Sequence, residues 1–214
     1  MTDCRVLFLS LLGLLAAGCI HLEQRVQINP NGSGVVTYEY SVAEDVFATL
    51  AAGHLAIGSW QSPPAAGLSW FASERAVNEH FTAPEFEVQL YRASRRDGRR
   101  AVRIVVLAPN LQQALDTGKL GDFRLARTPE GNWRFASLPP GGPPAVKPSE
   151  AEVARLRALC DDLWLRLEVS TPGPVLATTA KDRRERQAVW LFDPATDDSF
   201  LRARPRIELV YQGD

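Results

Sequence analysis

The sequence of 214 residues has no surplus of charge of either sign. Its 24 lysines and arginines are balanced by 25 aspartates and glutamates, which gives a net charge of −1 at pH 7. Proteins that bind nucleic acid usually carry a basic surplus, so we expect no nucleic-acid partner. With 45% hydrophobic residues, the composition is that of an ordinary globular domain rather than a disordered or fibrous chain.

The motifs on which many catalytic and metal sites depend are also lacking. The sequence contains no Gly-x-Ser-x-Gly turn, Ser-x-x-Lys pair, phosphate-binding loop or dinucleotide fingerprint. His21, His54 and His80 are scattered, without the pairing or the cysteine partners of a zinc site. We interpret Glu79-His80 as part of a solvated helix face. The sequence therefore predicts a protein that is not an enzyme and holds no cofactor or metal.

Cysteine is scarce, with Cys4, Cys19 and Cys160 as the only three. If Cys4 is removed with a signal peptide and Cys19 is modified, Cys160 is the only free thiol of the mature chain. No intrachain disulfide can then form in an exported compartment. Cys160 falls on the apolar face of an expected helix, which favours a buried, unreactive thiol.

Long apolar runs are absent as well. The longest, Val6–Ala17, has twelve residues, whereas a helix that crosses a bilayer needs about 20 apolar residues and a secretory signal about 7–15. We therefore interpret residues 1–18 as a signal peptide. We expect residues 19–214 to be an aqueous domain, because no other segment is long and apolar enough to span a membrane.

The signal peptide ends in Leu15-Ala16-Ala17-Gly18-Cys19, which resembles the lipobox of bacterial lipoproteins. The resemblance implies that Cys19 becomes the first residue, receives a diacylglycerol and is often acylated further, for example with palmitate. Two buried acyl chains suffice for a stable membrane anchor, at about 0.8 kcal/mol per methylene. The alternative is ordinary cleavage that releases a soluble secreted protein. In a source with two membranes, Ile20 in place of an aspartate favours the outer membrane, by analogy with the lipoprotein sorting rule.

The mature chain reads as hairpins with helices between them. About nine strands are expected, near residues 22–28, 36–42, 85–90, 102–106, 123–127, 133–138, 165–170, 189–192 and 207–211. Capping residues and apolar stripes predict helices near residues 41–53, 73–81, 110–118 and 149–163. We expect an α+β fold, with a curved antiparallel sheet built from hairpins and three or four helices packed on one face. Residues 19–214 are expected to form one domain with a Pro/Gly-rich loop at 139–148.

Three strand motifs carry a family resemblance. The first is Arg25-Val26-Gln27-Ile28-Asn29-Pro30-Asn31-Gly32-Ser33-Gly34, which follows the lipobox, the second is Val36-Thr37-Tyr38-Glu39-Tyr40, and the third is Leu167-Glu168-Val169-Ser170-Thr171-Pro172-Gly173-Pro174-Val175. In this order they resemble the LppM-type bacterial lipoprotein domain. The resemblance implies a lipid-binding α+β domain tethered outside the cell membrane, and it implies no catalytic residues.

Arginines concentrate in two turns, and these are our candidates for binding anionic headgroups: Arg95, Arg96, Arg99 and Arg100 in the first, and Arg183 and Arg184 in the second. Guanidinium groups bind phosphates in a bidentate manner. The alternative is that charged turn residues keep a sheet edge soluble. The five tryptophans could line an acyl-chain groove, although a core position is more usual for this residue.

Together these features favour a lipid-anchored, non-enzymatic envelope protein that binds a lipid or another amphiphile. Its partners would be the membrane, through acylated Cys19, and a lipid ligand. One alternative is an interaction or assembly module that holds another envelope protein. A hydrolase without a recognisable motif is a third hypothesis.

Overall fold

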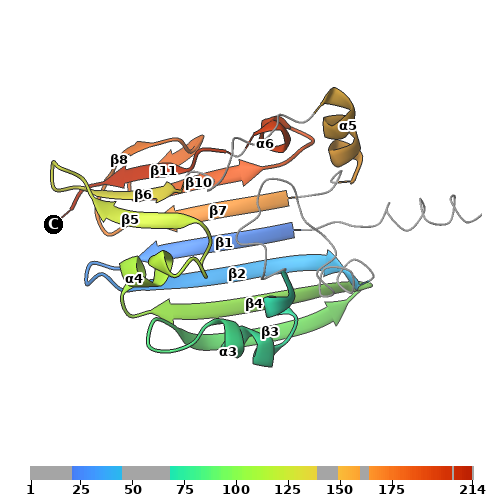
Figure 1. The fold of residues 1–214 in the computed structure, drawn as a ribbon, viewed down its shortest axis with the longest axis horizontal. Helices are drawn as coiled ribbons and strands as arrows, with labels where there is room; N and C mark the ends of the chain where they lie inside the picture. Colours follow the sequence, from blue (N-terminus) through green and yellow to red (C-terminus); the bar gives the residue numbers. More distant parts are fainter. Residues whose placement is uncertain (1–20, 45–67, 139–148, 160–163, 204, 214) are drawn as a thin grey trace, which may run out of the picture.

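The computed structural model describes residues 21–44, 68–138, 149–159, 164–203 and 205–213 (Figure 1). Several of the features expected above lie outside these residues. They are the signal peptide, Cys19, Cys160, Trp60, His54, the loop at 139–148 and the helix expected after Ser41.

Eleven strands in the described residues form two sheets. The larger sheet has the order β3-β4-β2-β1-β7-β10-β9, and the smaller sheet has the order β5-β6-β11-β8. The strands of the larger sheet are β1 (His21–Ile28), β2 (Gly34–Ala43), β3 (Glu87–Arg96), β4 (Arg99–Ala108), β7 (Trp164–Ser170), β9 (Asp182–Arg184) and β10 (Gln187–Phe192). Those of the smaller sheet are β5 (Phe123–Arg127), β6 (Trp133–Ser137), β8 (Val175–Thr178) and β11 (Glu208–Tyr211).

The three expected hairpins are present as β1-β2, β3-β4 and β5-β6, each antiparallel. The β3-β4 turn places Asp97 and Gly98 at φ 51° and 70°. Two successive left-handed residues are typical of a tight turn whose twist matches that of the flanking strands, and Asp-Gly tolerates them. The chemistry of the turn residues therefore accounts for the antiparallel pairing of β3 with β4.

The expectation of a single antiparallel sheet is wrong in two respects. First, β1 pairs with β7 in parallel, from His21↔Trp164 to Gln27↔Ser170. Second, the β5-β6 hairpin joins β11 in a separate sheet. Alternation along a strand identifies which face is buried, but it does not identify the neighbour when that strand lies far away in sequence.

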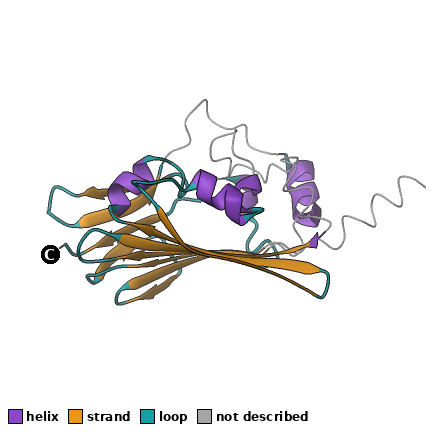
Figure 2. Cartoon of the chain, turned by 90° about the horizontal axis from the view of Figure 1, so that it is seen from below, coloured by secondary structure: helices purple, strands orange, loops and turns teal. Residues whose placement is uncertain are grey.

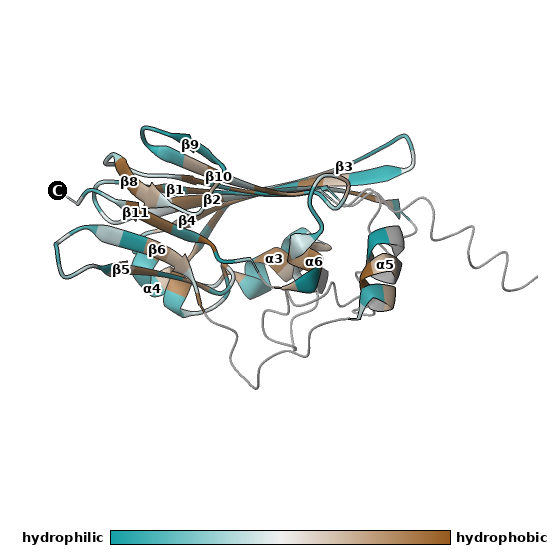
Figure 3. Ribbon diagram, turned by 90° about the horizontal axis from the view of Figure 1, so that it is seen from above, coloured by the Kyte–Doolittle hydropathy of each residue, from teal (hydrophilic) through white to brown (hydrophobic). Residues whose placement is uncertain are grey.

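The α+β class is confirmed. The helical elements are η2 (Leu68–Phe71), α3 (Glu74–His80), α4 (Leu111–Asp116), α5 (Glu150–Leu159) and α6 (Ser199–Arg202). The expected cap Asn110 is in place, because its side chain accepts from Gln113 N at 3.1 Å. The Ser73 side chain caps α3 in the same way, accepting from Ala76 N at 3.2 Å. Figure 3 shows the helices and the smaller sheet on the same side of the larger sheet.

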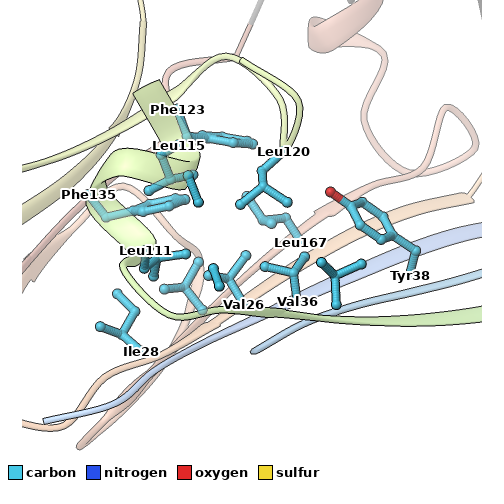
Figure 4. Close-up of a cluster of buried hydrophobic side chains, with 14 of the residues drawn as sticks. Val26, Ile28, Val36, Tyr38, Leu111, Leu115, Leu120, Phe123, Phe135 and Leu167 are labelled. Atoms are coloured by element: carbon cyan, nitrogen blue, oxygen red, sulfur yellow. The ribbon is translucent and has the colours of Figure 1, made fainter. Parts of the chain in front are cut away.

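One hydrophobic core joins the two sheets. Figure 4 shows Val26, Val36 and Leu167 of the larger sheet turned toward Leu111 of α4 and Phe135 of β6. Burial alternates along β2 and β7, so these strands turn one face into the core. In the edge-on view of Figure 2, none of the described helices covers the opposite face, here called the outer face. Polar residues of the larger sheet lie on this face.

Candidate functional site: the basic hairpin and the outer face

The four arginines of the first candidate cluster lie at the tip of the β3-β4 hairpin. The register pairs Arg95 with Arg100 and Arg96 with Arg99. A third pair, Arg92↔Arg103, lies four residues along the strands from Arg96↔Arg99. Like charges directly opposite one another destabilise a sheet. Arg96↔Arg99 and Arg92↔Arg103 share one face of the hairpin, because they are four residues apart, whereas Arg95↔Arg100 lies on the other face. The two pairs on the shared face form a basic surface that would be stabilised by an anion.

Protection of a sheet edge explains only half of this cluster. β3 is an edge strand, and charges on it discourage pairing with another chain. β4 lies between β3 and β2, so its arginines protect no edge. Arg99, Arg100 and Arg103 therefore need another explanation.

The four guanidinium groups are not equivalent. Arg95 pairs with Glu44 at 2.9 Å, and Arg96 pairs with Asp97 at 3.3 Å while remaining 90% exposed. Arg99 donates from Nε to Ser41 Oγ at 3.0 Å.

Arg100 differs because it is tied to the core side of the sheet. Its guanidinium donates to the carbonyl oxygen of Ala72 at 2.6 Å, just after η2. This half-buried arginine holds the η2–α3 segment against the sheet, so it supports the fold more directly than it offers a binding group.

Arg183 and Arg184 lie far from the hairpin, on β9 at the opposite edge of the sheet. They also lie at the opposite end, because Arg184 pairs with Gln187, and Gln187 pairs with Ser170 at the end of β7. Arg183 donates to the carbonyl oxygen of Val175. The structure does not bring the two predicted basic clusters together into one site.

The start of β1 lies at the same end of the sheet as the basic hairpin. His21 pairs with Ser41, Ser41 pairs with Ala101, and Ala101 pairs with Ser94. These four residues form one row across four strands, and the row borders the arginine pair Arg96↔Arg99. A chain entering at His21 therefore arrives next to the arginines.

An ion-pair network covers the middle of the outer face. Arg25 contacts Glu23 at 2.8 Å and Glu39 at 3.5 Å. Arg166 pairs with both Glu23 and Glu168. Burial alone would raise the pKa of Glu23, but hydrogen bonds from Arg25 and Arg166 outweigh it and hold that pKa below its ordinary value. A carboxylate held ionised in this way is a poor proton donor.

Three of the four described tryptophans occupy separate places. Trp190 is buried and donates from Nε1 to Thr179 Oγ1 at 3.1 Å. Trp133 lies under the Arg127 guanidinium, with 4.5 Å from Cζ to the ring centroid. Trp164 contacts His21, with 6.0 Å between ring centroids. These three do not line a common acyl-chain groove.

His80 differs from its interpretation as part of a solvated helix face. Its ring stacks on Trp70 with 4.8 Å between centroids and an interplanar angle of 11°. Burial lowers the pKa of His80 below its ordinary value, despite a hydrogen bond with the carbonyl oxygen of Lys119. The neighbouring Glu79 is exposed and pairs with Arg75 at 3.2 Å, one helical turn away. His80 thus packs in an aromatic cluster, and only Glu79 is solvated.

Within the described part of the chain, no three His, Cys, Asp or Glu side chains are grouped so that they could hold a metal ion. The same residues include no helix with the length and apolar character needed to cross a membrane.

The chain has a distant likeness among proteins of known structure. No protein-family model matches the chain, and a search of the curated proteins finds no match. Among solved structures, the chain is similar to the folded domain of LppM from Mycobacterium tuberculosis. The two share 10% sequence identity with a TM-score of 0.43, over 92% of this chain and 91% of that one.

Proposed function

We propose that this protein is a lipid-anchored, non-enzymatic lipoprotein of the cell envelope whose basic hairpin contacts anionic lipid of the membrane that holds it. In a source with two membranes, the proposed location is the outer membrane. The observation that supports the proposal is the common position of two features, because the start of β1 and the arginine pairs lie at the same end of the sheet.

Acylation of Cys19 would place this end of the sheet against the lipid. Two residues of chain span at most about 7 Å, so His21 cannot lie far from an acylated Cys19. A basic side chain near an anionic membrane surface contributes about 1 kcal/mol. Arg95 and Arg96 are the exposed members of the tip, with side chains 71% and 90% accessible. Together they would contribute about 2 kcal/mol, or about 30-fold in membrane partitioning.

Vesicle binding tests the role of the hairpin. The protein is the mature chain with Cys19→Ser, exported behind an ordinary signal peptide, which retains every described element because the first begins at His21. Co-sedimentation is measured with phosphatidylcholine vesicles that contain or lack phosphatidylglycerol. Arg95→Ser/Arg96→Ser should lower partitioning onto the anionic vesicles by about 10- to 30-fold.

The matched control is Arg184→Ser/Arg186→Ser, which removes the same charge near the far end of the sheet. It should change partitioning less than twofold. Equal losses in the two double variants would mean that net charge alone drives binding, and they would refute the role assigned to the hairpin.

The anchor itself is tested by intact mass spectrometry of the native protein. The expected mass is that of residues 19–214 plus a diacylglycerol and a further acyl chain, and Cys19→Ser should move the protein from the membrane to the soluble fraction. An unmodified mature chain in buffer would support the alternative of a soluble secreted protein.

An interaction module for another envelope protein is the second candidate. Leu191 favours it, because this side chain is 53% exposed beside Arg166 in the larger sheet. A stoichiometric partner, released when Leu191→Ser is introduced and co-purifying without lipid, would favour this candidate over lipid binding.

A further inference from the structure

A hollow on the outer face is lined by Arg92 and Arg103. The pair Arg96↔Arg99 lies four residues further along β3 and β4, about 13 Å away. Between the two arginine pairs lies the row Ser94, Ala101 and Ser41, whose short side chains leave the space open. The hollow has a volume of about 350 Å³, and His21 and Trp164 also line it. We call it the outer trench.

Arg92 and Arg103 make one side of the outer trench basic. Arg103 shares Glu39 with Arg25, at 3.3 and 3.5 Å, so one carboxylate serves two guanidinium groups. Arg92 has no ion-pair partner among the described residues and lies opposite Arg103. Glu23 also borders the trench, but Arg25 and Arg166 neutralise it. The charge left uncompensated at this side is therefore positive.

Hydroxyl groups on the floor add directional donors. Ser41 Oγ accepts a hydrogen bond from Arg99 Nε at 3.0 Å, which leaves its own proton available for an acceptor in the trench. Ser94 contributes a second hydroxyl from the same row, on the far side of Ala101. Two guanidinium groups and two hydroxyls around one hollow match the several acceptor oxygens of a phosphate better than the two of a carboxylate.

We propose that the outer trench is a binding site for a phosphate ester. Arg92 and Arg103 hold the phosphate oxygens, Ser41 donates a further hydrogen bond, and the ring of Trp164 contacts the organic part of the ligand. The ester comes either from a lipid headgroup or from a soluble metabolite. Only the first source rests on the proposed membrane contact of the hairpin.

Calorimetric titration of the mature Cys19→Ser protein tests the trench. The probes are glycerol 3-phosphate, inorganic phosphate, and dihexanoyl phosphatidylglycerol below its micelle concentration. Arg92→Gln should weaken binding of the ester by at least tenfold, and Arg184→Gln, on the distant β9, should leave it unchanged. Ala101→Leu should abolish binding by filling the floor without a change of charge, since Ala101 is exposed and a larger side chain fits there without disturbing the core.

The outcomes separate the trench from the hairpin. Ala101→Leu should leave partitioning onto phosphatidylglycerol vesicles within about twofold if the ester is a soluble metabolite, and should lower it if the ester is a lipid headgroup. Arg95→Ser/Arg96→Ser should lower partitioning in both cases. Tighter binding of the short-chain lipid than of glycerol 3-phosphate assigns the site to a headgroup, and the reverse assigns it to a soluble ester. No heat with any probe, or binding that survives Ala101→Leu, would overturn the trench whatever the vesicles show.

Discussion

Arg92→Glu tests whether repulsion between Arg92 and Arg103 lowers the stability of the folded protein. In the folded protein Arg92 lies opposite Arg103, whose guanidinium is 3.3 Å from Glu39 on its other side. The substitution replaces a like-charged pair by an opposite-charged one. A cross-strand charge pair is worth about 0.2–1 kcal/mol, and Arg103 is 54% exposed, so we expect a gain of about 0.5–1 kcal/mol at low salt. For a chain of this size the Tm should rise by about 1–4 °C.

Thermal and urea unfolding, followed by circular dichroism, measure this gain. At an ionic strength of about 1 M the Debye length falls to about 3 Å, so most of the gain should disappear. The neutral variant Arg92→Gln should give about half of it, and Arg184→Glu, which faces Gln187, should give none. A fall in stability at low salt, or a gain that salt leaves unchanged, would refute the idea that Arg92 and Arg103 repel each other. Arg92→Glu should also abolish phosphate-ester binding in the trench.

Three further predictions concern the fold. Leu111→Ala, at a fully buried side chain of α4, should lower the free energy of unfolding by about 2–5 kcal/mol in urea titrations, and a loss below about 1 kcal/mol would contradict the shared core. Arg100→Ser should cost about 1.5–3 kcal/mol in the same assay because it leaves the Ala72 carbonyl without its charged donor, whereas Arg95→Ser should be nearly neutral. The pKa of Glu23 is lowered in the folded state. The ionised carboxylate therefore stabilises the fold fully when the pH is above the ordinary pKa of 4.5, and this stabilisation is lost as the pH falls through the folded-state pKa. Glu23→Gln should therefore lower stability at pH 7 and flatten its acid dependence, and an unchanged slope between pH 5 and 3 would contradict this assignment.

Much of the local structure follows from short-range chemistry. Asp97-Gly98 adopts the left-handed turn that its sequence indicates, and Asn110 caps the helix that its position predicts. The parallel contact of β1 with β7 was not predictable in this way. These strands are separated by more than a hundred residues, and the alternation of each shows only that one of its faces is buried.

Some features of the candidate site were likewise predictable from the sequence, and others depend on contacts between distant segments. Clustering in a turn identified Arg95, Arg96 and Arg99 as basic surface residues, and the structure leaves them at the hairpin tip. The sequence pattern could not show that Arg100 donates a hydrogen bond to the carbonyl oxygen of Ala72, because η2 meets the sheet only in the folded chain. The outer trench was equally hidden, because its floor consists of small residues from strands distant in sequence, and it exists only through their register.

Strand direction explains why two similar basic clusters cannot have the same role. An acylated Cys19 would fix the membrane at the start of β1, and the antiparallel partners β2 and β4 bring the hairpin arginines to that level. Arg184 lies at the level of Gln27, six residues and about 20 Å along the strands from His21. This distance is about two and a half Debye lengths at physiological ionic strength, so the surface potential of the membrane is largely screened at Arg184. Under the proposed anchoring, membrane attraction would act on the hairpin and the trench, and β9 would face solvent or another protein.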